Sequence, residues 1–205
     1  MIRDNFDIIK DLLIFENEAD YYLVVLFKRK KDQIDNKFSY RINSVEWNYN
    51  ISIKDFYIFK KEDLDKYKDE IIALSELYNA RAYIFLQRKN YKETYKYTLK
   101  YFSEILINDK WEGEVDIMHN ASVDNYVDTK RRYLIDLDTE YFPLKDDLIN
   151  FVLRYNDDYL VLPSVTGEHI ICDNINEFEF TSKYPAIFLH TNKPSILYYN
   201  TKRDE

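Results

Sequence analysis

The sequence predicts an α/β (α+β) fold in one compact unit with two adjoining halves, residues 1–130 and residues 131–205. Runs rich in β-branched and aromatic residues, which are typical of strands, alternate with segments whose apolar residues recur at helical spacing. The chain has 205 residues, of which 46% are hydrophobic and 32% charged, so it is large enough to bury a substantial core. We therefore expect helices packed on sheets rather than a disordered or fibrous chain.

The first half is predicted to be a small α/β module. Its expected elements are a helix in 4–15, a strand in 21–28, one or two strands in 41–59, a helix in 61–77, a strand in 80–86 and a helix in 91–106. The last of these helices carries four large apolar side chains on one face, namely Tyr95, Leu99, Phe102 and Leu106. The polar stretch 108–130 has few apolar residues, which indicates a long loop or a mobile flap.

The second half is predicted to hold more strands than helices. Its expected elements are a strand in 132–137, a helix in 144–155, strands in 159–163 and 169–172, a short helical turn in 174–180 and strands in 187–190 and 195–199. The order strand, helix, strand, turn, strand, helix, strand is close to a split βαβ, or ferredoxin-like, arrangement. We therefore expect a single sheet covered by two helical segments.

Composition excludes several classes of protein. The longest apolar runs, such as 21–27, are far shorter than the roughly 18 residues that a membrane span needs, so no membrane helix is expected. The first residues lack the features of a secretory signal, which predicts a cytoplasmic protein. Cys172 is the single cysteine, so it can form no intrachain disulfide, and its apolar surroundings favour a core position. The net charge of -8 disfavours a simple nucleic-acid-coating protein.

A pair of carboxylates ends the strand predicted in 132–137. Asp136 and Asp138 are separated by one residue, so both side chains lie on the same face of the strand. Two adjacent like charges repel unless a cation joins them, and Mg²⁺ or Mn²⁺ is a natural counter-ion because carboxylates and substrate phosphates are its usual ligands. The alternative is a solvent-exposed strand end whose carboxylates cap the following turn.

A rare glycine and a histidine mark the turn between the strands in 159–163 and 169–172. Gly167 is one of only two glycines in the chain, and His169 follows it at the start of an apolar run. Either a hairpin turn with positive φ or a close approach of the backbone to a phosphate would require glycine here. His169 is either a phosphate-contacting residue or a hydrogen-bonded histidine of the core.

Together these two elements resemble the motifs of the archaeo-eukaryotic primase superfamily, in particular its primase-polymerase branch. Members carry an apolar strand ending in D-x-D or D-x-E and then, after a helix and a strand, a glycine-containing turn ending in S-x-H or G-x-H. Asp136 and Asp138 match the first motif, and Gly167 and His169 match the second, 33 residues after Asp136. The resemblance covers roughly 131–199 and implies an RRM-like catalytic sheet packed against a smaller N-terminal α/β module.

The resemblance implies a metal-dependent nucleotidyltransferase that joins nucleoside triphosphates on a DNA or RNA template, with Mg²⁺ or Mn²⁺ as its cofactor. Asp136 and Asp138 would bind the metal, and His169 would contact the phosphates of the incoming nucleotide. The other residues expected at the nucleotide are Ser164, Thr166, Gly167 and Arg131. A helicase or another replication protein is an expected partner, and a membrane is not.

The sequence departs from the family at its third motif, an apolar residue followed by Asp on a late strand. Phe188 stands where that carboxylate is expected. Either His190 or Asp173 substitutes for it, or one metal site is weak, or the chain is a catalytically inactive relative that binds nucleic acid or protein. A further alternative is a small acidic interaction protein in which both motif matches arose by chance.

Several cations are candidates for a triphosphate or a template. Arg132 and Arg81 lie at the ends of predicted strands, and a basic run occupies 28–31. Each has the alternative of being a solvated charge at a strand end. A looser resemblance, through 22–32, 79–84 and 192–198, connects the chain with small proteins of phages and mobile elements.

Overall fold

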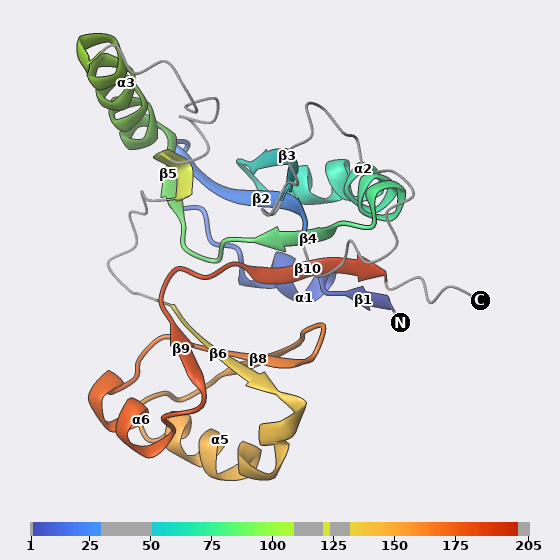
Figure 1. Cartoon of the computed structure of the whole chain (residues 1–205), viewed down its shortest axis with the longest axis vertical. Coiled ribbons are helices and arrows are strands. Elements are labelled where there is room, and N and C mark those ends of the chain that lie inside the picture. Colours follow the sequence, from blue (N-terminus) through green and yellow to red (C-terminus); the bar gives the residue numbers. More distant parts are fainter. Residues whose placement is uncertain (1, 30–50, 109–120, 124–131, 201–205) are drawn as a thin grey trace, which may run out of the picture.

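The structure is a computed structural model that describes residues 2–29, 51–108, 121–123 and 132–200. In this part of the chain, strands form two antiparallel sheets and helices pack against them (Figure 1). The predicted α/β class is therefore confirmed at this level. The strand and helix segments predicted from periodicity are found as well, with ends that differ by a few residues; residues 41–50 and most of 108–130 lie outside the described residues.

The larger sheet has six strands. Its members are β1 (Ile2–Asp4), β10 (Ser195–Asn200), β4 (Arg81–Ile84), β2 (Asp20–Lys28) and β3 (Ile51–Ile58), in that spatial order, with β5 (Lys89–Asn90) paired to β2. Helices α1 (Phe6–Leu12) and α2 (Lys61–Tyr78) share an apolar core with this sheet through Ile9 and Ile71, which are fully buried. The first half is thus not the smaller module that the family resemblance implied, since it contributes most of the larger sheet.

The smaller sheet has the spatial order β7-β8-β6-β9 and is antiparallel throughout. Its strands are β6 (Tyr133–Asp138), β7 (Leu160–Pro163), β8 (Gly167–Cys172) and β9 (Phe188–His190). The 3₁₀ helix η2 (Thr139–Leu144) leads from β6 into α5 (Lys145–Leu153), and α6 (Glu177–Lys183) joins β8 to β9. Helices α5 and α6 lie on the side of this sheet that faces away from the larger sheet (Figure 1).

Alternation of side chains fixes which face of the smaller sheet meets the helices. Ile135 and Leu137 on β6 and Ile170 on β8 share a buried cluster with Phe151 of α5 and Phe180 of α6. Because successive side chains of a strand point to opposite faces, the residues between them lie on the face that looks toward the larger sheet. Cys172 belongs to the helix-side core, where burial raises the pKa of its thiol to about 12. The predicted core position of this cysteine agrees with its burial.

The last strand returns to the larger sheet. β10 follows β9 along the chain, yet it pairs with β1 and β4 rather than with the strands of the smaller sheet. Nearly all of its residues are buried, as in a central strand covered on both faces. The second predicted half, 131–205, therefore spans both sheets, and the chain crosses between them twice.

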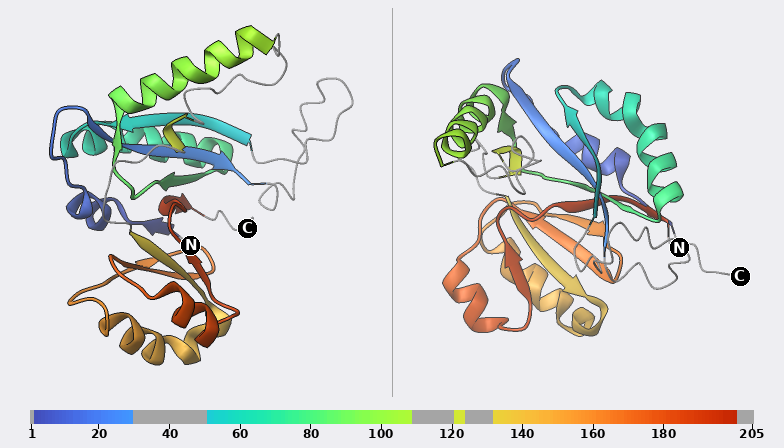
Figure 2. Two further views of the ribbon diagram at one scale, coloured as in Figure 1. Left: turned by 90° about the vertical axis from the view of Figure 1, so that its left-hand side faces the viewer. Right: turned by 45° about the horizontal axis from the view of Figure 1, so that its top comes forward.

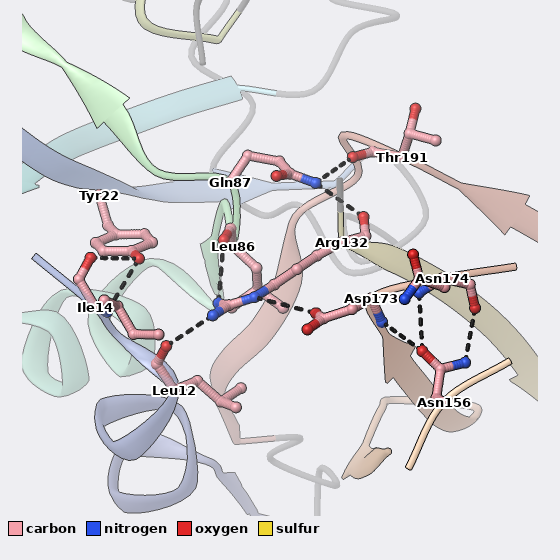
Figure 3. A network of polar contacts seen from close by, with 10 residues as sticks. All are labelled: Leu12, Ile14, Tyr22, Leu86, Gln87, Arg132, Asn156, Asp173, Asn174 and Thr191. Atoms are coloured by element: carbon pink, nitrogen blue, oxygen red, sulfur yellow. Dashed lines mark hydrogen bonds and ion pairs between the residues drawn. The ribbon is translucent and has the colours of Figure 1, made fainter. Parts of the chain in front are cut away.

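Polar side chains tie the two crossings together (Figure 3). The Gln87 side-chain amide is almost fully buried and donates to the backbone carbonyls of Arg132, 2.9 Å away, and Thr191, 2.8 Å away. The Arg132 guanidinium donates in turn to the carbonyl of Leu12 at 3.1 Å. On another side, Asn5 donates to carbonyls of both sheets, Pro163 and Ile196. Buried backbone carbonyls at the junction thus find partners, as their desolvation requires.

Helix α3 (Tyr91–Asn108) differs from its prediction in packing, although not in position. It extends away from the larger sheet (Figure 2). The predicted apolar face is exposed in the described structure, with Leu99 at 68% of its full exposure. The helical spacing of apolar residues correctly predicted the helix. Its apolar face, however, packs against none of the described residues closely enough to be buried.

Gly167 occupies its position for a reason that differs from both of those expected. Its φ does not lie in the left-handed region, and the constraint comes from the neighbouring strand. A Cβ added to Gly167 would lie 2.1 Å from the carbonyl oxygen of Leu137 and 2.8 Å from the Cα of Asp138. Glycine is thus required so that β8 can approach the end of β6.

We expect Gly167→Ala to lower the free energy of unfolding by about 2 kcal/mol or more, because β6 and β8 must separate to admit the methyl group. Urea denaturation at neutral pH measures this change. Val165→Ala, in the same turn, is the control and should change stability by no more than about 0.5 kcal/mol. A Gly167→Ala protein as stable as the wild type would contradict the close approach of the two strands.

Candidate functional site

The pairing of β6 with β8 brings the two sequence motifs together. Asp136 lies directly opposite His169, and Asp138 lies directly opposite Gly167. All four residues are on the face of the smaller sheet that looks toward the larger sheet, since Ile135, between the motif positions, packs on the helix side. Side chains that are 33 residues apart in sequence are therefore cross-strand neighbours.

Asp136 has two close neighbours on this face, Lys193 and His169. One carboxylate oxygen accepts a hydrogen bond from the Lys193 ammonium at 2.5 Å, and the other lies 3.6 Å from Nε2 of His169. Burial acts to raise the pKa of Asp136, but the hydrogen bond from Lys193 and the nearby positive charge outweigh burial and lower the pKa. Asp136 is therefore an anion at neutral pH, with an ammonium as its present counter-ion.

His169 is both a buried core residue and a neighbour of the carboxylate pair. Its Nδ1 lies 2.9 Å from the Ser195 hydroxyl at the start of β10, and only 5% of the residue is exposed. Burial lowers the pKa of the imidazole to about 4, although the Asp136 carboxylate acts in the opposite direction. The ring is therefore neutral at pH 7, with one nitrogen on Ser195 and the other toward Asp136.

Asp138 is held by the turn that carries the second motif. The Thr166 hydroxyl donates to Oδ1 of Asp138 at 2.6 Å, and the Thr139 amide donates to the Thr166 carbonyl at 3.1 Å. Ser164 is buried, and its backbone amide donates to the carbonyl of Gly167. Thr166 and Gly167 thus lie beside Asp138, while Arg131 lies outside the described residues.

The other candidate cations lie elsewhere. Arg132 is engaged with backbone carbonyls at the junction of the sheets, and its Nε lies 4.0 Å from Asp173. Arg81 is buried in the larger sheet, with its guanidinium over the ring of Tyr199. Of the basic run, only Lys28 and Arg29 are described; Lys28 ends β2 in the larger sheet, and Arg29 follows it.

Phe188 occupies the position at which the primase resemblance implies a third carboxylate. Phe188 pairs in register with Asp136 across β6 and β9, and 68% of its surface is exposed. Of the two substitutes considered, Asp173 faces Arg132, whereas Nε2 of His190 lies 3.3 Å from the Lys193 ammonium. Burial and the charge of Lys193 lower the pKa of His190. His190 thus approaches the site through Lys193, not through a carboxylate.

Sequence reasoning missed two residues of the site, Lys193 and Ser195. Lys193 lies in the segment that crosses from β9 to β10, and Ser195 begins β10. They reach Asp136 and His169 only because β10 returns to the larger sheet. A lysine and a serine around a proline resemble any surface turn, so their side chains carried no signal. Only the placement of β10 could have revealed them.

The described residues contain no group of three or more His, Cys, Asp or Glu side chains placed to hold a metal. Two carboxylates on one face are nevertheless sufficient for Mg²⁺ or Mn²⁺ when substrate phosphates complete the shell. A bound ion would have to take the place of Lys193 at Asp136.

Comparison with known proteins found no match among family models, curated proteins or solved structures. Within the described ranges, no helix combines the length and the apolar character that crossing a membrane requires. The geometry of the site and the two motifs are therefore the basis on which a function can be proposed.

We expect the Asp136–Lys193 pair to be coupled by about 1 kcal/mol, because both groups are partly buried and their hydrogen bond is short. A double-mutant cycle with Asp136→Asn and Lys193→Met, followed by urea denaturation at pH 7, measures the coupling. The more exposed Lys183–Asp147 pair on α6 and α5 is the matched control and should give less than about 0.5 kcal/mol. Equal coupling in the two pairs would show that Lys193 is not a specific counter-ion.

Proposed function

We propose that the protein is a metal-dependent nucleotidyltransferase of the primase type, which joins nucleoside triphosphates on a nucleic-acid template. The observation that carries the proposal is the register of β6 and β8, which sets Asp136 opposite His169 with Asp138 on the same face. Chance motif matches would have no reason to meet as cross-strand neighbours. A small acidic interaction protein is for that reason the weaker alternative.

The topology of the smaller sheet supports the proposal. The connectivity β6-α5-β7-β8-α6-β9, with the spatial order β7-β8-β6-β9, is that of a split βαβ unit. We propose that it corresponds to the RRM-like catalytic sheet of the primase superfamily. In this proposal the carboxylates occupy the first strand of the unit and the histidine occupies the third.

The residues of the site have distinct roles in the proposed reaction. Asp136 and Asp138 would hold Mg²⁺ or Mn²⁺, which neutralises phosphate charge and activates the attacking hydroxyl when it is bound. His169, neutral and fixed by Ser195, presents its other nitrogen on the same face, where it can donate to a phosphate oxygen. Thr166 orients Asp138 through its hydroxyl.

A second candidate is a primase-like module that binds nucleotide or nucleic acid without turnover, as a factor in replication or in conflict between phage and host. Two observations favour it: Phe188 occupies the position of the third carboxylate, and the Lys193 ammonium is bonded to Asp136. Such a protein would retain ligand binding but lack synthesis. The two candidates therefore differ in a single measurable property.

We expect the purified protein to extend or synthesise strands from nucleoside triphosphates in the presence of Mn²⁺ or Mg²⁺. Asp136→Asn and Asp138→Asn should each lower the rate by at least about 100-fold, since each removes a proposed metal ligand. Incorporation of labelled nucleotides on single-stranded DNA and RNA templates measures the rate. Chelation of the metal should abolish the activity.

Asp157→Asn is the control, because this carboxylate is exposed in the segment between α5 and β7 and should leave the rate unchanged. Undiminished synthesis by Asp136→Asn or Asp138→Asn would refute the metal assignment. Metal-dependent nucleotide binding by a wild-type protein that makes no product would instead support the second candidate.

A further inference from the structure

An exposed aromatic side chain lies beside the carboxylate pair. Phe188 is on β9, the edge strand of the smaller sheet, and lies on the same face as Asp136, its partner in register. Its exposure of 68% leaves most of the ring surface in contact with water. Leu189, the next residue, packs into the helix-side core, so the orientation of β9 places Phe188 outward by alternation.

The Phe188 ring is supported from one side. It stacks on the imidazole of His190, with ring centroids 6.0 Å apart and planes inclined by 18°. His190 is itself positioned by Lys193, whose ammonium lies 3.3 Å from Nε2. The ring therefore contacts His190 and, through it, lies near Lys193, unlike an isolated surface phenylalanine.

A cation lies within the same group. The Lys193 side chain is 38% exposed, and its ammonium bridges His190 and Asp136. At this edge of the sheet, an aromatic face lies next to an ammonium and to a carboxylate pair able to hold a divalent ion. This arrangement matches a nucleotide, which presents a flat base and an anionic phosphate a few ångströms apart. Aromatic faces accept every base, since each base has a π-face.

We propose that Phe188, stacked on His190, is a platform for a nucleobase and that Lys193 contacts the adjoining phosphate. This inference deepens the proposed function and rests on it, because it names the base-binding part of the same site. The ligand is a nucleobase with its phosphate, either in a free nucleoside triphosphate or in a single strand of nucleic acid. The residue that departs from the catalytic motif would thus serve in binding.

Fluorescence anisotropy tests the platform with two probes, a fluorescent ATP analogue and a labelled 12-nucleotide oligo(dT), each with Mn²⁺ and with chelator. We expect Phe188→Ala to raise the Kd of at least one probe by about 5-fold to 150-fold, the loss of one stacked base. Phe188→Trp, which retains an aromatic face, should stay within about threefold of the wild type. The matched control is Phe178→Ala, since Phe178 is 83% exposed on α6 and should not affect binding.

Loss of affinity for the ATP analogue alone assigns the platform to the incoming nucleotide, and loss for the oligonucleotide alone assigns it to the strand. Unchanged affinity of Phe188→Ala for both probes, or a wild type that binds neither, would overturn the inference. Thermal melts monitored by circular dichroism establish that each variant is folded. The proposed function fails separately, if strand synthesis is absent while the Phe188→Ala effect on binding persists.

Discussion

The register between β6 and β8 is the constraint on which the rest of the site depends. A slip of one residue would turn Asp136 and Asp138 into the helix-side core and expose Ile135 and Leu137. Apolar burial on one face therefore selects the register that gathers polar groups on the other. Gly167 is a second constraint on the register, because only a residue without a Cβ can lie against the Leu137 carbonyl.

The return of β10 to the larger sheet supplies what the smaller sheet lacks. It brings Ser195 to His169, and the preceding turn brings Lys193 to Asp136. Gln87 binds both crossing segments through one buried amide, so the site is supported by each sheet (Figure 3). Burial at this junction keeps His169 neutral, and the Lys193 ammonium keeps Asp136 charged. The junction of the two sheets therefore determines both the positions of these side chains and their charge states.

Periodicity predicted the strands and helices well, because local spacing of apolar residues largely determines them. It also placed Asp136 and Asp138 on one face. Long-range pairing was less accessible: the apolar run of β10 fits a central strand of either sheet, so its return to the larger sheet was not evident. The role of Lys193 depends on that pairing, and the role of Gly167 depends on the close approach of β8 to β6. Neither feature leaves a signal in the local sequence. The exposure of the apolar face of α3 was not evident for a related reason, since amphipathic spacing does not reveal whether another part of the protein covers that face.

We propose that the Asp136–Asp138 face binds a divalent ion together with a nucleotide. Crystals of the full chain grown with Mn²⁺ and a non-hydrolysable nucleoside triphosphate, measured at the manganese absorption edge, test it most directly. We expect an anomalous peak in contact with both carboxylates, the triphosphate beside His169, and Lys193 released from Asp136. An anomalous map without manganese at these carboxylates, with Lys193 still bonded to Asp136, would contradict it.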